Sequence, residues 1–145
     1  MMRFQKRSLI PAPVEVVFAY CVSQSGFRQQ FPFRVEWLNG PEIWGIGDEI
    51  DFRYRVNGIW LRHTARIVEF ELNRCFVDEM TGGFYRAFRH RHEFEPSDTG
   101  TWVIDEVEFS LGFGSWLDRT LGGVTLQRVF ARRHKVLQDH FLGGL

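Results

Sequence analysis

The chain has 145 residues, a length that suits one domain, and we predict a single domain over residues 1–145. Its 18 Lys and Arg residues balance 18 Asp and Glu residues, whereas a nucleic-acid-binding protein normally carries a basic excess or a basic face. No segment approaches the roughly 18 apolar residues of a membrane span, and the N-terminal segment has no apolar signal core. We therefore expect no nucleic acid partner, no membrane insertion and a cytoplasmic location, with Cys21 and Cys75 as reduced, buried thiols.

Aromatic residues are unusually abundant, because Phe, Trp and Tyr together make up 16% of the chain. These rings are a large apolar content for one small domain. They are enough either to overfill a solid core or to line a hollow one.

The first third of the chain is predicted to form one strand and two short helices. Residues 3–10 mix polar and apolar types as an extended segment does, and Pro11 and Pro13 suit the first turn of a helix that continues through Tyr20. A second short helix is predicted over residues 23–31, because Pro32 would end it.

From about Val35 the pattern changes to the alternation of half-buried strands. Residues 48–56 place apolar side chains on one face and charged ones on the other, and Asn57-Gly58 is a strong hairpin signal. Further strands are predicted at 59–70, 75–81, 84–95 and 101–111, separated by turn residues. This succession of hairpins predicts an antiparallel meander.

A long amphipathic helix is predicted to close the chain. Ser115 is a suitable N-cap, and apolar residues repeat at three- and four-residue steps as far as Phe141. Gly122-Gly123 weakens its first part, and Gly143-Gly144 ends it. The predicted class is α+β, with a curved antiparallel sheet of about seven strands wrapped around this helix and two short helices after the first strand.

Several segments resemble the helix-grip fold of the START/Bet v1-like (SRPBCC) superfamily. These are residues 10–18 (IPAPVEVVF), residues 47–50 (GDEI) and the C-terminal helix. Residues 76–84 (FVDEMTGGF), 90–94 (HRHEF) and 101–107 (TWVIDEV) are most similar to an uncharacterised bacterial ligand-binding branch related to polyketide cyclase/dehydrase-like proteins. The resemblance implies a deep cavity between sheet and helix that accepts apolar small molecules. It transfers no catalytic residues, because none are common to the superfamily.

Alternation along the strands predicts which side chains face that cavity. If Phe88 and Phe94 point inward, then Arg86, His90 and His92 share their face, and the same rule applies to the neighbouring strands. The predicted ligand-binding residues are Phe52, Tyr54, His63, Ile67, Asp78, Met80, Arg86, Phe88, His90, His92, Val103, Asp105, Phe109, Phe130 and Arg133.

The polar members of this set allow two interpretations. Buried ionisable groups are costly unless paired, so a structural network is the simpler one. Alternatively, His90, His92 and Asp105 orient a ligand or act as general acid and base. His90 and His92 could also bind a metal with His63, but the spacing fixes no third ligand, so we expect neither a metal nor another cofactor. Arg133, near the apolar stripe of the long helix, could close the cavity over an anionic group.

Three functions remain open from the sequence. The first, which we favour over catalysis, is the binding of a hydrophobic small molecule such as a lipid or polyketide. The second is an aromatase/cyclase-like enzyme that uses the His and Asp residues of the cavity. The third is an interaction module or homodimer that binds its partner through the sheet edge or the long helix. Trp37, Trp44 and Trp60 would indicate a partner surface if they were exposed, but packing at the sheet edge is the simpler interpretation.

Overall fold

A computed structural model describes residues 1–114, 116 and 118–143. Its strands are β1 (Met2–Ile10), β2 (Arg34–Asn39), β3 (Glu49–Val56), β4 (Ile59–Glu71), β5 (Cys75–Gly82), β6 (Ala87–Ser97) and β7 (Gly100–Ser110). Its helices are α1 (Val14–Cys21), α2 (Gln24–Gln30), a π-helical turn η1 (Asp118–Gly122) and α4 (Gly123–Gly143).

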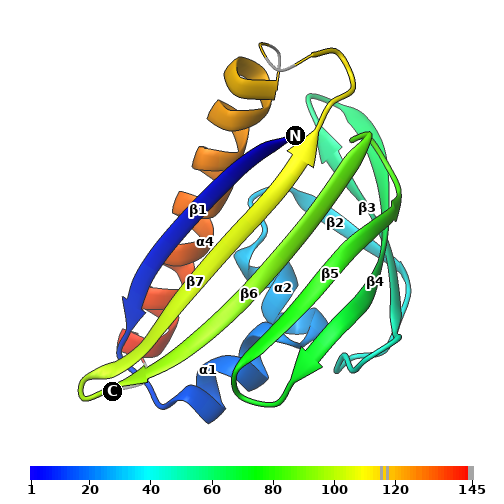
Figure 1. Cartoon of the computed structure of the whole chain (residues 1–145). Helices are drawn as coiled ribbons and strands as arrows, with labels where there is room; N and C mark the ends of the chain where they lie inside the picture. The colour runs from blue at the N-terminus through cyan, green and yellow to red at the C-terminus, as the bar shows by residue number, and fades with distance from the viewer. Residues whose placement is uncertain (115, 117, 144–145) are drawn as a thin grey trace.

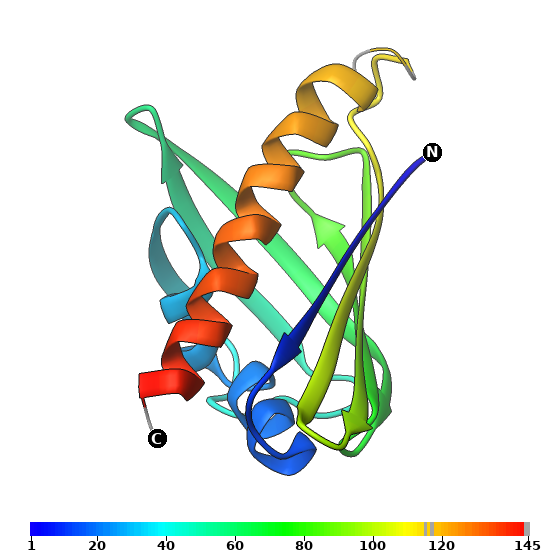
Figure 2. The same cartoon turned by 90° about the vertical axis from the view of Figure 1, so that its left-hand side faces the viewer.

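All seven strands form one antiparallel sheet in the order β1-β7-β6-β5-β4-β3-β2. The sheet is strongly curved, and α4 lies along its open, concave side (Figures 1 and 2). The short helices α1 and α2 cover one end of the same side (Figure 1). This arrangement confirms the predicted α+β helix-grip fold.

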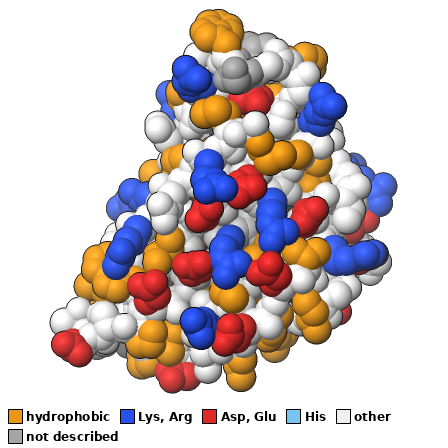
Figure 3. Space-filling view, viewed as in Figure 1, with side chains coloured by type: hydrophobic (Ala, Val, Ile, Leu, Met, Phe, Trp, Pro, Cys, Tyr) orange, Lys and Arg blue, Asp and Glu red, His pale blue; other side chains and the backbone are white. Residues whose placement is uncertain are grey.

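The convex face of the sheet carries charged side chains of both signs, which alternate across neighbouring strands (Figure 3). Arg89 pairs with Glu69 and Glu79, and Arg91 pairs with Glu69 and Glu93. Exposed pairs of this kind each contribute little to stability, but they leave no large excess of one charge on this face. The apolar side chains of the strands therefore face α1, α2 and α4.

Close packing between α1 and α2 fixes the end of the molecule opposite the start of α4. The Ser23 hydroxyl caps α2 by accepting a hydrogen bond from the Gly26 backbone N–H at 3.0 Å. A Cβ at Gly26 would lie 1.9 Å from the Tyr20 carbonyl oxygen, so only glycine allows this approach. Phe18 on the buried face of α1 packs edge-on against Phe70, Phe76 and Phe94, which makes this end of the core solid.

The start of β6 differs from the prediction. We expected a strand from residue 84, but the chain bends through residues 83–86 after Gly82-Gly83, and β6 begins at Ala87. Pairing with β5 begins only at Arg89. The alternation predicted for Arg86 therefore fails, and its side chain is exposed instead of facing inward.

The long helix is present where predicted, with an irregular start. The expected N-cap Ser115 and the expected terminal Gly144 lie outside the described residues. The π-helical turn η1 immediately precedes Gly123, where the Gly122-Gly123 pair was expected to weaken the helix. Buried Asp118 accepts a hydrogen bond from the Leu111 backbone N–H at 2.7 Å, which ties the helix start to the end of β7.

Candidate ligand-binding cavity

A cavity of about 330 Å³ lies between the concave face of the sheet, α2 and α4. Phe84 and Thr125, which line it near the start of α4, are exposed, so the cavity opens at that end. Its lining residues are Cys21, Phe27, Gln30, Phe31, Phe33, Trp44, Ile50, Phe52, Tyr54, Val56, Leu61, His63, Asp78, Phe84, Tyr85, Phe88, His90, His92, Thr125, Leu126, Val129, Phe130 and Arg133.

Aromatic rings form most of one wall. The ring of Phe27 on α2 lies 4.9 Å from that of Phe52 on β3, and Phe31, one helical turn later, meets Tyr54 at 5.4 Å. Buried Trp44 continues this wall, with Trp37 stacked beside it. Trp60 lies apart from them, under the guanidinium of Arg53 at 4.5 Å. The three tryptophans therefore do not form a common partner surface.

A cluster of ionisable side chains forms another part of the cavity wall and extends behind it. We call it the polar cluster; its members are Asp78, His90, His92, Asp105, Arg133 and His134. Asp105 on β7 is fully buried at its centre. Its Oδ1 accepts from His90 Nε2 at 2.8 Å, and its Oδ2 accepts from Arg133 Nε at 2.8 Å and from His134 Nε2 at 2.6 Å. Asp105 thereby joins the sheet to α4.

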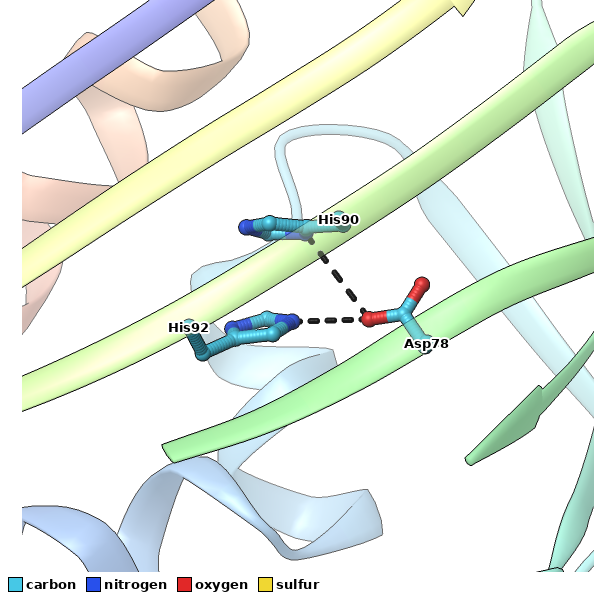
Figure 4. Close-up of side chains that lie close together, drawn as sticks. All are labelled: Asp78, His90 and His92. Carbon is cyan, nitrogen blue, oxygen red and sulfur yellow. Dashed lines mark hydrogen bonds and ion pairs between the residues drawn. The ribbon is translucent and has the colours of Figure 1, made fainter. Parts of the chain in front are cut away.

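The imidazoles of His90 and His92 lie beside each other, next to Asp78 (Figure 4). The rings of His90 and His92 are 3.5 Å apart, and Phe76 stacks on the other side of His92 at 3.9 Å. Nε2 of His92 lies 2.7 Å from Oδ2 of Asp78, whereas Nδ1 of His90 lies 3.9 Å from the same oxygen. Asp78, His90 and His92 all line the cavity, but Asp105 lies behind them.

Burial and pairing decide the charges of the polar cluster. Burial alone would raise the pKa of Asp105, but Arg133 and the surrounding histidines hold that pKa well below its usual value. Burial would also raise the pKa of Asp78, and the hydrogen bond from His92 lowers it instead. Burial and the neighbouring His90 lower the pKa of His92 to about 4. At neutral pH both carboxylates are therefore ionised, and His92 is neutral and donates to Asp78.

Arg133, which we expected to close the cavity over an anion, lines the cavity, but its guanidinium is paired within the polar cluster. Burial alone would lower the pKa of Arg133, but the neighbouring Asp105 raises it, and the net pKa lies above its usual value. The guanidinium is therefore charged. Its nitrogens are already engaged: Nε donates to Asp105, Nη1 to Gln30 Oε1, and Nη2 contacts His92 Nδ1 at 3.3 Å and Cys21 Sγ at 3.9 Å. Arg132, its neighbour, is exposed to solvent.

Ligand atoms of Asp78, His90 and His92 lie within 4.8 Å of one another, a spacing that could hold a metal ion. The third member is thus Asp78 and not His63, which we had considered. The imidazole rings of His90 and His92 are stacked, so the in-plane lone pairs of their nitrogens point in similar directions and do not converge on one metal position. Charged Arg133 also lies 3.3 Å from His92. This geometry favours hydrogen bonding within the group over a tetrahedral metal centre.

Nine of the fifteen residues predicted to bind ligand line the cavity, and six do not. Ile67 and Val103 are fully buried in the solid core with α1, and Phe109 packs in a second core cluster with Leu126 and Phe130. Asp105 faces inward, but the histidines cover it. The remaining two are Met80, which lies half-buried near Gly83, and exposed Arg86.

The lining residues that come from the helices and from the bend before β6 do not follow from alternation along the strands. Phe27 on α2 and Phe31, the C-cap residue that follows α2, are four residues apart, a spacing that could have indicated a shared face. Gln30 and Cys21 reach the cavity from α2 and α1. Tyr85 replaces the predicted Arg86 because the chain bends there.

No protein-family model matches the sequence, and no curated protein sequence matches it. Solved structures are similar along nearly the whole chain. TTHA0849 from Thermus thermophilus has a TM-score of 0.78 at 18% identity, over 99% of both chains. Ginseng major latex-like protein 151 from Panax ginseng has a TM-score of 0.75 at 9% identity, over 97% of both chains. The di-domain ARO/CYC StfQ from the steffimycin biosynthetic pathway has a TM-score of 0.78 at 13% identity, over 99% of this chain and 52% of StfQ.

These likenesses establish the fold. The chain has the helix-grip fold that the sequence resemblance predicted. Within the described residues, no helix is long and apolar enough to cross a membrane.

Proposed function

We propose that this protein binds a hydrophobic small molecule in the cavity between the sheet and α4. The observation that carries the proposal is the combination of an apolar, mainly aromatic wall with one polar wall in a volume of about 330 Å³. Small-molecule sites have this composition: an apolar lining with a few placed polar groups, in clefts of roughly 300–1,000 Å³. The sheet and α4 supply the rigid frame of such a site.

A variant that fills the cavity tests this proposal. Val129 on α4 lines the cavity, so Val129→Trp would place an indole in the space a ligand needs. We expect the wild type to bind the uncharged probe N-phenyl-1-naphthylamine with a rise in its fluorescence, and Val129→Trp to weaken that binding by at least about 10-fold, since a filled site loses most of its contacts.

The matched control is Val124→Trp, because Val124 is on the same helix but is exposed and does not line the cavity. It should bind the probe as the wild type does. Failure of the wild-type protein to bind the probe, or equal loss of binding in both variants, would count against a ligand site in this cavity.

A second candidate function is general acid–base catalysis on a bound ligand, as an aromatase or cyclase requires. Two observations favour it: Nδ1 of His90 is directed toward Asp78 at the cavity surface, and the ARO/CYC protein StfQ has the same fold. The wild-type protein should then turn over a cyclisable polyketide. His90→Gln should abolish that turnover and still bind the probe. Unchanged turnover would reject the role of His90.

A further inference from the structure

We propose that the open end of the cavity docks on the surface of an anionic lipid bilayer. The contact is made by exposed aromatic and basic side chains at this end, which we call the mouth rim: Phe84, Phe113, Trp116, Arg55, Arg86 and Arg119. This inference goes beyond the proposed function, because it concerns the outer surface of the protein and not the ligand in the cavity. The contact is with the bilayer surface, so no segment has to cross the membrane.

The mouth rim lies where three connections meet beside the start of α4 (Figure 1). The strands β3, β5 and β7 all end there, because their direction alternates with that of β4 and β6. The connection before β6 lies against the one after β7. The Arg86 backbone N–H donates to the Ser110 carbonyl at 2.8 Å, and a Cβ at Gly112 would lie 3.2 Å from Cδ of Arg86. Phe84 lines the cavity, so the mouth rim borders its opening.

Exposed aromatic rings are confined to this end of the molecule. Among the residues that the structure describes, only three Phe, Tyr or Trp residues are exposed: Phe84 at 58%, Phe113 at 78% and Trp116 at 71%. The other described aromatic residues are buried or half-buried. Exposed rings at connections are costly in water, and Trp and Phe are favoured at the boundary between lipid headgroups and acyl chains.

Unpaired positive charge accompanies these rings, although the whole chain is neutral. Arg55, Arg86 and Arg119 are exposed, and none of them forms an ion pair within the described part of the chain. Between positions 111 and 134 the sequence has a single acidic residue, Asp118, and it is buried. In the space-filling view, apolar side chains at this end lie between basic ones (Figure 3).

The opposite end of the sheet carries the other sign of charge. Glu71, Glu95 and Asp98 are exposed there, and Arg74 pairs with Glu71. The positive end of the molecule is therefore the end at which the cavity opens. An anionic bilayer matches it, because the bilayer attracts arginines, accepts aromatic rings and dissolves apolar ligands. An acidic protein surface would match the arginines but would give the rings no apolar phase to enter.

Sedimentation with lipid vesicles tests the inference. We expect the wild type to bind vesicles of phosphatidylcholine with about 30% phosphatidylglycerol at least about 10-fold more tightly than vesicles of phosphatidylcholine alone. This preference should decrease as salt is added. Trp116→Ala and Arg119→Glu should each weaken binding to the anionic vesicles by about 10-fold, since one removes an inserted ring and the other reverses a charge.

The matched controls are Leu72→Ala and Arg74→Glu, at the opposite end. Leu72 is 70% exposed, and Arg74→Glu changes the net charge as Arg119→Glu does. Both should bind the anionic vesicles as the wild type does. All four substituted positions are exposed, so circular dichroism should show an unchanged fold.

Equal binding of the wild type to both kinds of vesicle, no binding to either, or equal losses in the rim and control variants would overturn the inference. Binding to polyglutamate without binding to vesicles would also overturn it and would assign the mouth rim to an acidic protein. The binding of N-phenyl-1-naphthylamine is measured without vesicles. The proposed function and this inference can therefore fail separately.

Discussion

Replacing Asp105 with Asn is expected to lower the free energy of unfolding by about 3–5 kcal/mol. The carboxylate is fully buried and accepts hydrogen bonds from His90, Arg133 and His134. Asparagine has a similar size but no charge, and its amide nitrogen cannot accept. The Arg133 guanidinium would then remain buried without a counter-charge. Urea unfolding followed by far-ultraviolet circular dichroism measures the effect.

Asp51→Asn is the matched control for this change. Asp51 accepts two hydrogen bonds from Arg62, at 3.0 and 2.6 Å, but that pair is on the exposed face of β3 and β4. Loss of this pair should lower the free energy of unfolding by about 1 kcal/mol or less. If Asp105→Asn were no more destabilising than Asp51→Asn, the polar cluster would not hold α4 to the sheet as we describe.

Stability is also expected to fall as the pH is lowered from about 6.5 to about 4. In the unfolded chain His92 titrates near its ordinary pKa of 6.5, whereas in the folded protein burial and His90 lower its pKa to about 4. The unfolded state therefore binds more protons within this window, and protonation favours unfolding there. The difference between the two pKa values corresponds to a loss of up to about 3 kcal/mol. Burial lowers the pKa of His63 too, which acts in the same direction.

The ionised carboxylates of Asp78 and Asp105 affect stability in a lower pH range. Asp78 and Asp105 have pKa values below 3.8 in the folded protein, so the stability they contribute is present above that pH and is lost only as the pH falls further. The decline between pH 6.5 and 4 thus reports mainly on the buried histidines. Urea unfolding at several pH values across this window measures it.

His92→Phe should remove most of this pH dependence, although it also lowers stability at neutral pH because Asp78 loses its donor. His140→Gln is the control, since His140 is exposed on α4 and should leave the slope unchanged. A His92→Phe variant with the full wild-type slope would show that His92 is not the group responsible.

The sheet could be predicted because its local signals agree with one another. Residues 48–56 alternate between apolar and polar, and the structure has β3 at Glu49–Val56. The Asn57-Gly58 turn was expected to form a hairpin, and both residues have the positive φ angles that this turn needs, 50° and 80°. The start of β6 could not be predicted, because the bend after Gly82-Gly83 depends on pairing with β7 rather than on the residues of the segment itself.

Only part of the candidate site could be predicted from the same sequence patterns. Alternation identifies the face on which a side chain lies, and it placed Asp78, His90 and His92 correctly on the inner wall. It does not give depth, so Asp105 was expected at the cavity surface, although two histidines cover it. The contributions of Phe27 and Gln30 depend on how α2 docks on the sheet, which is a tertiary property.

The most direct test of the account is nuclear magnetic resonance of the wild-type protein with bound N-phenyl-1-naphthylamine. We expect intermolecular nuclear Overhauser effects from the aromatic protons of the probe to Phe52 and Phe130, which line the cavity. Contacts confined to the outer face of the sheet, or no contact with any residue that lines the cavity, would contradict it.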